Sequence, residues 1–432
     1  MDQKAKPAPT FAEAFSVWLK IGVLSFGGPA AQIALMHREI VEENGWLTER
    51  QFLNALSFCM LLPGPEAMQL ATYAGWRLHG VAGGLAAGLA FVLPGAAVVL
   101  VLAIIYAAFG NVPLVEALFL GIKAAVLVIV IEALLRIARR AMTGIEAWAI
   151  AALSFIGIFF VALPFPLIVF GAALWGFLRA GRDDALTDPA EPFTGSAGET
   201  LRTALIWLAI WIVPLALLAV ALGPDSKLAQ IGYFFSKLAV VTFGGAYAVL
   251  AYMGQDVVVR LGWLEAGQMM DGLGLAETTP GPLILVTEFV GYLAAWRDGG
   301  IALGLAGAAV SLWATFAPCF LWIFVGAPYV EWINAQPRLK GALTAITAAV
   351  VGVIANLAIW FALHVFFGTV TLNRVGPLTL WTPDPSTLDR RVITLAVISG
   401  ALLLWRHWSV PLVLSVSAGL ALVIQFAPSL LA

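Results

Sequence analysis

The sequence predicts an all-α integral membrane protein of about thirteen transmembrane helices, arranged as two inverted-topology repeats that each contain a helix broken at Pro-Gly-Pro. Three observations predict this fold. Hydrophobic residues make up 61% of the 432 and charged residues 11%, whereas a soluble domain is typically ~25% charged. Apolar runs of crossing length follow one another along nearly the whole chain. A motif-bearing stretch of the first half recurs in the second.

Apolar runs bounded by proline, glycine or charge define the predicted crossings, since about 20 residues span the hydrocarbon core. They lie at 11–36, 52–79, 81–108, 112–138, 144–162, 164–180, 200–222, 226–253, 267–296, 299–328, 341–366, 388–405 and 408–430. The runs 52–79 and 267–296 are longer than one crossing requires, and each contains Pro-Gly-Pro. Because proline lacks an amide donor and fixes φ, each run is predicted to be two half-helices joined by an unwound turn.

Matching residues in the two halves stand 217 positions apart. The pairs are Lys20 and Lys237, Gly27-Gly28 and Gly244-Gly245, Trp46 and Trp263, Gln51 and Gln268, and Pro63-Gly64-Pro65 and Pro280-Gly281-Pro282. A constant offset over such residue types indicates an internal duplication. We therefore expect a cytoplasmic tail at 1–10 and transporter repeats at 11–222 and 223–432. The repeats begin an odd number of crossings apart, which inverts the second and suits alternating access.

The distribution of arginine and lysine predicts the orientation. One cluster ends the run 112–138, at Arg136, Arg139 and Arg140, and another follows the run 164–180. Positive residues gather in cytoplasmic loops, so both clusters and the N-terminus are expected on the cytoplasmic side of a bacterial inner membrane.

Several function classes are disfavoured. A net charge of −2 without a basic run gives no surface for nucleic acid. Cys59 and Cys319 lie in different halves, without the spacing of a metal or redox site. The sequence holds no dinucleotide fingerprint, flavin motif or haem signature, so we expect neither an enzyme nor a bound cofactor or metal.

The paired helix breaks predict the binding site. In hydrocarbon an unwound helix is tolerated only where it is buried in protein or lines a cavity. The half-helices after Pro65 and Pro282 would offer amides at a positive dipole end, which suits an anion. A kink that only shapes packing is the alternative. The expected substrate-binding residues are Lys20, Ser25, Gly27, Gly28, Pro63, Gly64, Pro65, Gln69, Lys237, Thr242, Gly244, Gly245, Pro280, Gly281 and Pro282.

Charged residues inside apolar runs add to this prediction. A lysine at the centre of a membrane helix costs at least ~2.5–3.5 kcal/mol, so Lys20 and Lys237 are expected to bind the anion, with snorkelling as the alternative for Lys20. Glu66 follows the first Pro-Gly-Pro and has no acidic counterpart, because Leu283 stands there in the second half. Glu66 and Glu277 are the expected ion-coupling residues; Glu288 lies just after the second motif.

Three sequence runs carry a family resemblance: Leu24 to Gln32, His37-Arg38-Glu39, and Leu62 to Tyr73 with its Pro-Gly-Pro. Together with Thr242 to Gly245 and Thr279 to Pro282, they make the chain similar to the chromate transporter family, specifically its long two-domain efflux members. The resemblance implies export of the chromate dianion across the bacterial inner membrane and hence chromate resistance.

Other readings stay open. The substrate is chromate or a sulfate-like oxyanion, and a passive anion channel would need no alternating access. Lipid is an expected partner, and the small-residue faces at 80–88 and 299–307 suit either internal packing or a homodimer.

Overall fold

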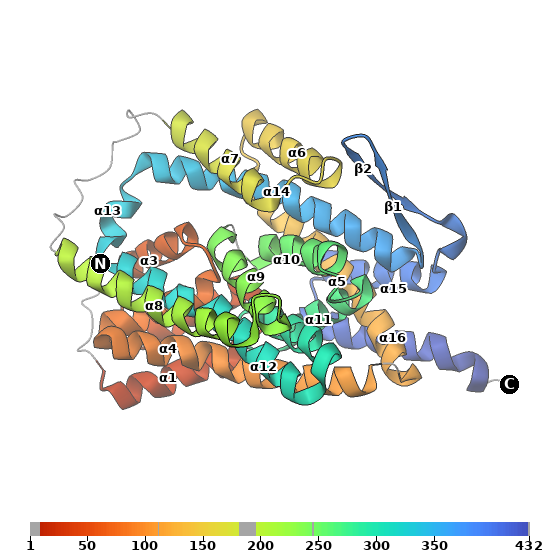
Figure 1. The fold of residues 1–432 in the computed structure, drawn as a ribbon, viewed down its shortest axis with the longest axis horizontal. Coiled ribbons are helices and arrows are strands. Elements are labelled where there is room, and N and C mark those ends of the chain that lie inside the picture. Colours follow the sequence, from red (N-terminus) through yellow and green to blue (C-terminus); the bar gives the residue numbers. More distant parts are fainter. Residues whose placement is uncertain (1–8, 111, 181–195, 244–245, 431–432) are drawn as a thin grey trace. The chain divides into compact units, whose positions relative to one another are not determined.

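The structure is a computed structural model that describes residues 9–110, 112–180, 196–243 and 246–430, most of them in helices (Figure 1). The chain forms two compact units from discontinuous segments. The first unit comprises Met1–Leu102, Phe177–Ala246 and Thr279–Leu343, and the second comprises Ala103–Gly176, Tyr247–Thr278 and Thr344–Ala432.

Five described helical stretches are long and apolar enough to cross a membrane. They are Glu66–Phe109, Pro113–Ala141, Ala197–Leu222, Leu283–Asn334 and Pro337–Phe366, and shorter apolar helices accompany them. The protein is therefore a multi-pass α-helical membrane protein. The prediction of thirteen crossings counted apolar runs, several of which the structure divides or joins.

The first unit contains short helices, long helices and single turns. In chain order these elements are α1 (Phe11–Leu24), α2 (Gly28–His37), the π-helical turn η1 (Arg38–Glu43), α3 (Glu49–Leu61), α4 (Glu66–Phe109), α8 (Ala197–Leu222), α9 (Lys227–Val241), the 3₁₀ turn η4 (Leu283–Leu285), α12 (Val286–Gly326), the 3₁₀ turn η5 (Ala327–Tyr329) and α13 (Val330–Asn334). Capping boxes start two of them: the Thr10 and Thr48 side chains accept from the amides of Glu13 and Gln51 at the starts of α1 and α3.

The two longest helices, α4 and α12, each fold back as a hairpin. The backbone of α4 leaves the helical conformation at His79 and Gly80, where Gly80 has a φ of 61°. The arms on either side pack so closely that a Cβ on Gly75 would lie 2.3 Å from the carbonyl oxygen of Gly83. The same bend occurs in α12 at Gly299–Gly300. Both helices therefore have a short first arm and a second, oppositely directed arm.

The predicted crossing 11–36 is not one helix, because the chain breaks between α1 and α2. The Phe11 and Trp18 rings lie 5.5 and 6.1 Å from the His79 ring, at the start of the long arm of α4. Further along α1, a Cβ on Gly22 would meet the carbonyl oxygen of Ala90. Beyond the break the chain returns, since Trp46 packs on the cluster formed by Ala14, Trp18, Ala87 and Ala90. The segment 11–46 thus begins and ends beside the same end of the long arm of α4.

The predicted crossing 52–79 is also a re-entrant hairpin. Its turn at Pro63–Pro65 lies beside Cys319, and the Phe58 ring lies against Gly326 further along α12. Closer to the start of α3, the Asn334 side chain donates a 2.8 Å hydrogen bond to the carbonyl oxygen of Asn54. The short arm of α4 also runs back from the turn towards the C-terminal end of α12, because Gly84, just past the bend that ends this arm, packs on Phe324. Both ends of the hairpin therefore lie towards the C-terminal end of α12.

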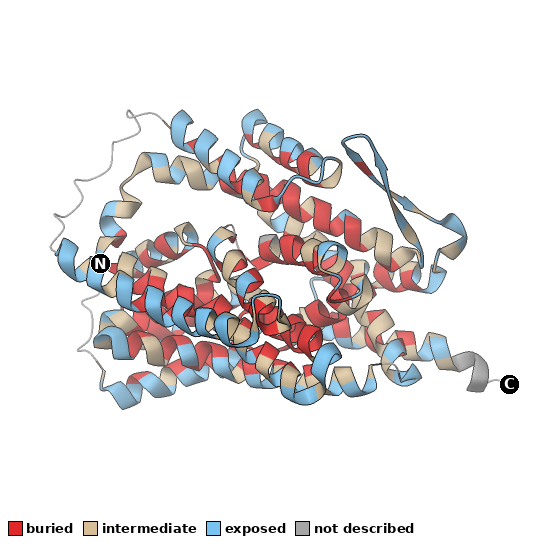
Figure 2. Ribbon diagram, viewed as in Figure 1, coloured by how far each residue is buried: buried red, intermediate tan, exposed pale blue. Residues whose placement is uncertain are grey.

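The helix α8 differs from the others of the first unit in its exposure. Of its described residues only Trp207 and Trp211 are buried, and Figure 2 shows most of its surface as exposed. Since its side chains are apolar, α8 has the character of a helix that faces lipid.

The second unit packs further helices against α5. Its elements are α5 (Pro113–Ala141), α6 (Ile145–Phe159), α7 (Phe165–Arg179), α10 (Ala246–Gln255), the π-helical turn η3 (Asp256–Arg260), α11 (Ala266–Thr278), α14 (Pro337–Phe366), α15 (Arg390–Gly400), the π-helical turn η7 (Ala401–Trp405) and α16 (Val410–Leu430). A Cβ on Gly121 of α5 would lie 2.2 Å from the Ser417 carbonyl oxygen, so α5 and α16 are in close contact.

The prediction of an all-α protein was wrong for one segment. Strands β1 (Val370–Val375) and β2 (Leu378–Pro383) pair antiparallel, with Val375 opposite Leu378. Two residues close the turn, and the first, Gly376, has a φ of 60°. Glycine at the first turn position is typical of a type II′ hairpin. Apolar runs of crossing length do not reveal a strand pair this short, and the Gly376-Pro377 turn between the strands was not considered.

The order of elements in the first half recurs in the second. The series α1, α2, η1, α3, α4 and α5 corresponds to α9, α10, η3, α11, α12 and α14. Equivalent left-handed glycines, Gly45 with a φ of 63° and Gly262 with 60°, follow the two π-helical turns. They are also 217 residues apart.

Candidate functional site

Broken helix ends from both halves of the chain are bonded to one another in the first unit. The Gly64 amide donates a 3.0 Å hydrogen bond to the Thr242 carbonyl oxygen, and the Gly281 amide donates a 2.9 Å bond to that of Ser25. We call these breaks, Ser25–Gly28, Pro63–Pro65, Thr242 and Pro280–Pro282, the tip cluster. The predicted residues Gly244 and Gly245 lie outside the described part of the chain.

Both bonded pairs of tips lie beside the first half of the long arm of α4. A Cβ on Gly95 would lie 2.1 Å from the Pro280 carbonyl oxygen. A Cβ on Gly64 would lie 3.1 Å from Sγ of Cys319, whose neighbour Phe320 packs on Gly88. At about 1.5 Å per residue, Gly88 lies ~12 Å and Gly95 ~22 Å along an arm of ~45 Å. The tip cluster therefore lies between about a quarter and a half of the way along this arm.

Glycine is required at both Pro-Gly-Pro turns. Gly64 has a φ of 114° and Gly281 of 87°, in the region that side chains disfavour. The flanking prolines remove two amides from each turn, so the glycine amide is the donor available for bonding to the opposite tip.

A buried glutamine holds each turn from the side. Gln69 donates through Nε2 to the Pro63 carbonyl oxygen at 2.7 Å, and Gln32 donates to that of Gly281 at 2.6 Å. The side-chain Oε1 atoms of both glutamines are buried and accept no hydrogen bond from the residues that the structure describes. Such unpaired acceptors are uncommon in folded proteins and point to a site that holds water or a ligand. Gln69 was predicted; Gln32 was missed as a site residue.

The Ser25 and Thr242 hydroxyls donate hydrogen bonds to carbonyl oxygens of their own helices. They donate to the carbonyl oxygens of Ile21 at 2.6 Å and Leu238 at 2.5 Å. Both residues are buried, and their own carbonyls receive the glycine amides. The structure thus places the two predicted residues in the tip cluster through their backbones.

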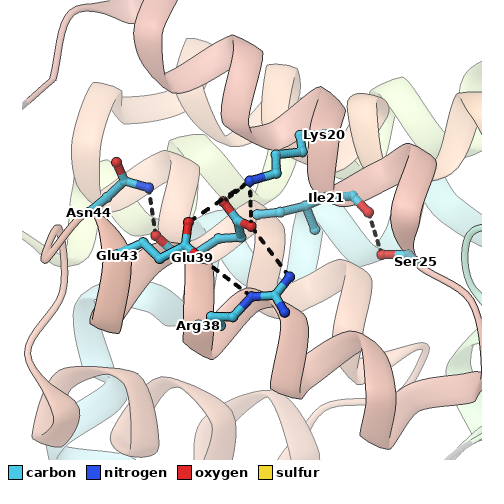
Figure 3. A network of polar contacts seen from close by, with 7 residues as sticks. All are labelled: Lys20, Ile21, Ser25, Arg38, Glu39, Glu43 and Asn44. Atoms are coloured by element: carbon cyan, nitrogen blue, oxygen red, sulfur yellow. Dashed lines mark hydrogen bonds and ion pairs between the residues drawn. The ribbon is translucent and has the colours of Figure 1, made fainter.

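Lys20 forms an ion pair outside the tips. Its Nζ lies 2.7 Å from Oε1 of Glu39, and Oε1 also lies 3.7 Å from Nη2 of Arg38 (Figure 3). Glu43 and Asn44 complete this network, the latter donating to the Glu39 carbonyl oxygen. The Glu39 side chain is only 2% exposed and that of Lys20 is 48% exposed. The lysine charge is therefore compensated by a buried carboxylate that the sequence prediction did not include.

The remaining predicted residues are divided between the units. Gly27 and Gly28, with φ of 83° and 77°, form the first tip, and Lys237 is half-buried on α9 of the first unit. Glu66 begins α4 beside the first Pro-Gly-Pro. Glu277 belongs to the second unit, where it accepts a 2.9 Å hydrogen bond from Tyr247.

Acidic residues lie in the first turn of both helices that follow the Pro-Gly-Pro motifs, Glu66 in α4 and Glu288 in α12. The 3₁₀ turn Leu283–Leu285 separates the second motif from α12, which begins at Val286. Glu66 is the first residue of α4 and Glu288 is the third residue of α12, so the two carboxyl groups lie near the helix starts without occupying matching positions.

The second unit contains its own buried polar group. Asp271 is 3% exposed, and its Oδ2 accepts a 2.7 Å hydrogen bond from Tyr106 and lies 3.3 Å from Nζ of Lys123. Glu132 forms an ion pair with Arg136 one turn later on α5. The intramembrane charges at Lys123 and Glu132 are thereby paired.

These features define a multi-pass helical membrane protein whose interrupted helices meet in the first unit. The chain belongs to the chromate transporter family, whose profile matches residues 12–177 and 229–423. The two matched stretches begin 217 residues apart, which is the spacing of the paired motifs.

Individual relatives cover most of the chain. A chromate transport protein of Pseudomonas aeruginosa is 33% identical over 87% of this chain and 86% of its own. A chromate transport protein of Cupriavidus metallidurans is 30% identical over 82% and 84%. A probable chromate transport protein of Synechococcus elongatus is 28% identical over 92% and 96%. No solved structure matches the chain.

Proposed function

We propose that this protein is a secondary transporter that exports chromate from the cytoplasm across the bacterial inner membrane. The observation that carries the proposal is the tip cluster, in which Pro-Gly-Pro turns bond to helix ends of the other half. Its family membership and the names of its relatives support a chromate transport role.

The anion is held mainly by backbone amides. The helices α2, α4 and α12 begin at or next to the tips, so their N-terminal amides and positive dipole ends meet there. Lys237 contributes positive charge from α9. Lys20 contributes only in a conformation that releases it from Glu39. Glycine at the tips lets the oxyanion approach the backbone closely.

Alternating access is supported by two repeats, 11–222 and 223–432, of opposite topology. Because 11–46 and 49–79 are re-entrant, the first repeat crosses the membrane with the long arm of α4, then α5, α6, α7 and α8. Five is an odd number, so the second repeat begins on the opposite side, and the cytoplasmic N-terminus is retained. The two repeats can then exchange conformations, and this exchange converts an inward-open state into an outward-open state.

Transport into inverted membrane vesicles tests this function. Labelled chromate should accumulate in vesicles that contain the protein when a proton, sodium or potential gradient is imposed, and each gradient is applied alone to identify the driving force. Saturable, gradient-dependent accumulation supports the carrier. Chromate flux that follows only its own concentration and the imposed potential, does not saturate, and is unaffected by a proton or sodium gradient at zero potential would contradict the proposal and indicate a passive channel.

Sulfate is the second candidate substrate, because a tetrahedral dianion of similar shape would meet the same amides. Competition of unlabelled sulfate against labelled chromate measures the preference. Inhibition by about half at equal, saturating concentrations would show that the site does not discriminate, and nearly full inhibition would show a preference for sulfate.

A further inference from the structure

Glu288 is a buried carboxyl for which the described part of the chain offers no hydrogen-bond or ion-pair partner. It lies in the first turn of α12, its residue is 1% exposed, and its Oε2 forms no hydrogen bond with the described residues. One turn later, the fully buried Tyr292 also has a hydroxyl without a described partner. An isolated carboxylate in apolar surroundings is very costly, so an unpaired buried carboxyl requires an explanation.

The position of Glu288 connects it to the tip cluster. The neighbouring Thr287 hydroxyl lies 3.4 Å from that of Thr315 on the second arm of α12. Cys319, one turn beyond, donates to the Thr315 carbonyl oxygen and contacts Gly64. Glu288 is therefore at the depth of the tips and at the helix end where the proposed function places the anion.

Among the described residues, Glu288 forms no ion pair with a charged side chain. The elements packed against α12 are α3, α4, α8, α9, η5 and its own second arm. Their ionisable side chains, with those of α12 itself, are Glu49, Arg50, Cys59, Glu66, Tyr73, Arg77, His79, Tyr106, Glu199, Arg202, Lys227, Tyr233, Lys237, Tyr292, Arg297, Asp298, Cys319 and Tyr329. Lys227, at the far end of α9, pairs with Asp298.

Two negative groups compete for the same helix end. The N-terminal dipole of α12 stabilises an ionised Glu288, and it equally stabilises a bound oxyanion. With both present, two like charges would face each other in a poorly solvated place, which disfavours ionisation of the carboxyl. The α12 dipole can thus stabilise either the Glu288 carboxylate or the bound anion, but not both at once.

We propose that Glu288 is a proton-binding site linked to anion binding. At a pH at which the empty site holds Glu288 ionised, its carboxylate takes one proton from the solvent when an oxyanion occupies the N-terminus of α12, and the neutral acid releases that proton when the anion leaves. This inference rests on the proposed function and adds to it a residue that couples proton and anion occupancy. Glu277 is a weaker candidate, because it is hydrogen-bonded to Tyr247.

Proton uptake on anion binding tests the inference. Purified protein in weakly buffered solution is titrated with sulfate and with chromate, while a pH indicator reports protons and calorimetry reports binding. We expect the wild type to take up about one proton per anion, and its anion affinity to change about tenfold per pH unit over the range in which Glu288 titrates. The Glu288→Gln variant should bind the anion without this uptake, and the Glu199→Gln variant on exposed α8 should behave as wild type.

The outcomes separate the two proposals. Unchanged proton uptake in Glu288→Gln would overturn the role of Glu288 while leaving anion binding intact. Absence of anion binding by the wild type would instead refute the proposed function. If Glu288→Gln does not fold, infrared difference spectra of the wild type decide the question. Anion binding should then produce the carbonyl stretch of a newly protonated carboxylic acid, and its absence would contradict the proposal.

Discussion

Lys20 and Glu39, 19 residues apart, face each other across the first re-entrant hairpin, with 2.7 Å between Nζ and Oε1. Because Glu39 is buried and Lys20 is half-exposed, Lys20→Met should strand a buried carboxylate and reduce stability by about 1–3 kcal/mol, less than the ~3–5 kcal/mol of a fully buried pair. Thermal unfolding in detergent measures this loss.

The double variant Lys20→Met/Glu39→Gln is the matched control for that prediction. It should recover most of the stability, since no buried charge is left alone. If transport returns with stability, Lys20 serves the hairpin; if transport stays absent in a stable protein, Lys20 also serves the anion. A double variant as unstable as the single one would contradict the ion-pair interpretation.

Gly95→Ala should remove transport. The new methyl group would lie 2.1 Å from the Pro280 carbonyl oxygen, so the second Pro-Gly-Pro turn has to move. Vesicle uptake of chromate should fall at least tenfold while the protein still inserts. Gly171→Ala is the control, because the position on α7 has open space and should tolerate the change. Normal uptake by Gly95→Ala would show that the turn position is unimportant.

Gln32→Leu should weaken the tip cluster by about 1–3 kcal/mol, because the Gly281 carbonyl oxygen loses a buried donor. Chromate affinity should fall with it. The comparison variant is Gln230→Leu, whose side-chain hydrogen bond is exposed. Equal behaviour of the two variants in binding and melting experiments would argue against a role of Gln32.

In the second unit, Tyr106→Phe should destabilise the protein by about 1.5–3 kcal/mol if Asp271 is ionised, since the carboxylate loses its 2.7 Å hydrogen bond. A double-mutant cycle with Asp271→Asn isolates this interaction. A coupling energy near zero would mean that the tyrosine contributes only packing.

The re-entrant hairpin 49–79 predicts which positions share a membrane side. Single cysteines at Glu49 and Val81, in a background with Cys59→Ala and Cys319→Ala, should react with an impermeant thiol reagent from the same side. A cysteine at Phe109, the end of the long arm of α4, should react from the other. Opposite accessibility of Glu49 and Val81 would restore the simple crossing that the sequence predicted.

Much of the fold follows from the sequence because apolar run length and proline chemistry are local. The break at Pro63–Pro65 is one such feature: α3 ends at Leu61 and α4 begins at Glu66. The re-entrant path is not local, since a half-helix and a crossing have similar composition. Only contacts such as that of Trp46 with the cluster of Ala14, Trp18, Ala87 and Ala90 show that the chain turns back.

The candidate site was predictable where a motif repeats and less so elsewhere. The glycines of both Pro-Gly-Pro turns are in the tip cluster, whereas Gln32 matches Val249 in the second half and so gives no repeat signal. Glu39 matches the acidic Asp256 at the same offset, a signal that was available in the sequence. Glu288 matches Ala71, so the repeat does not point to it.

The exchanged hydrogen bonds also constrain biosynthesis. Gly64 enters the bilayer long before the ribosome has made Thr242, the residue that accepts its amide proton. Until then this amide has no partner from the other half, so a nascent chain halted at Leu222 exposes an unfinished turn to lipid or to a quality-control protease. Maturation of the core is therefore a late event that waits for translation of the second half, although every residue of the first turn is already in place.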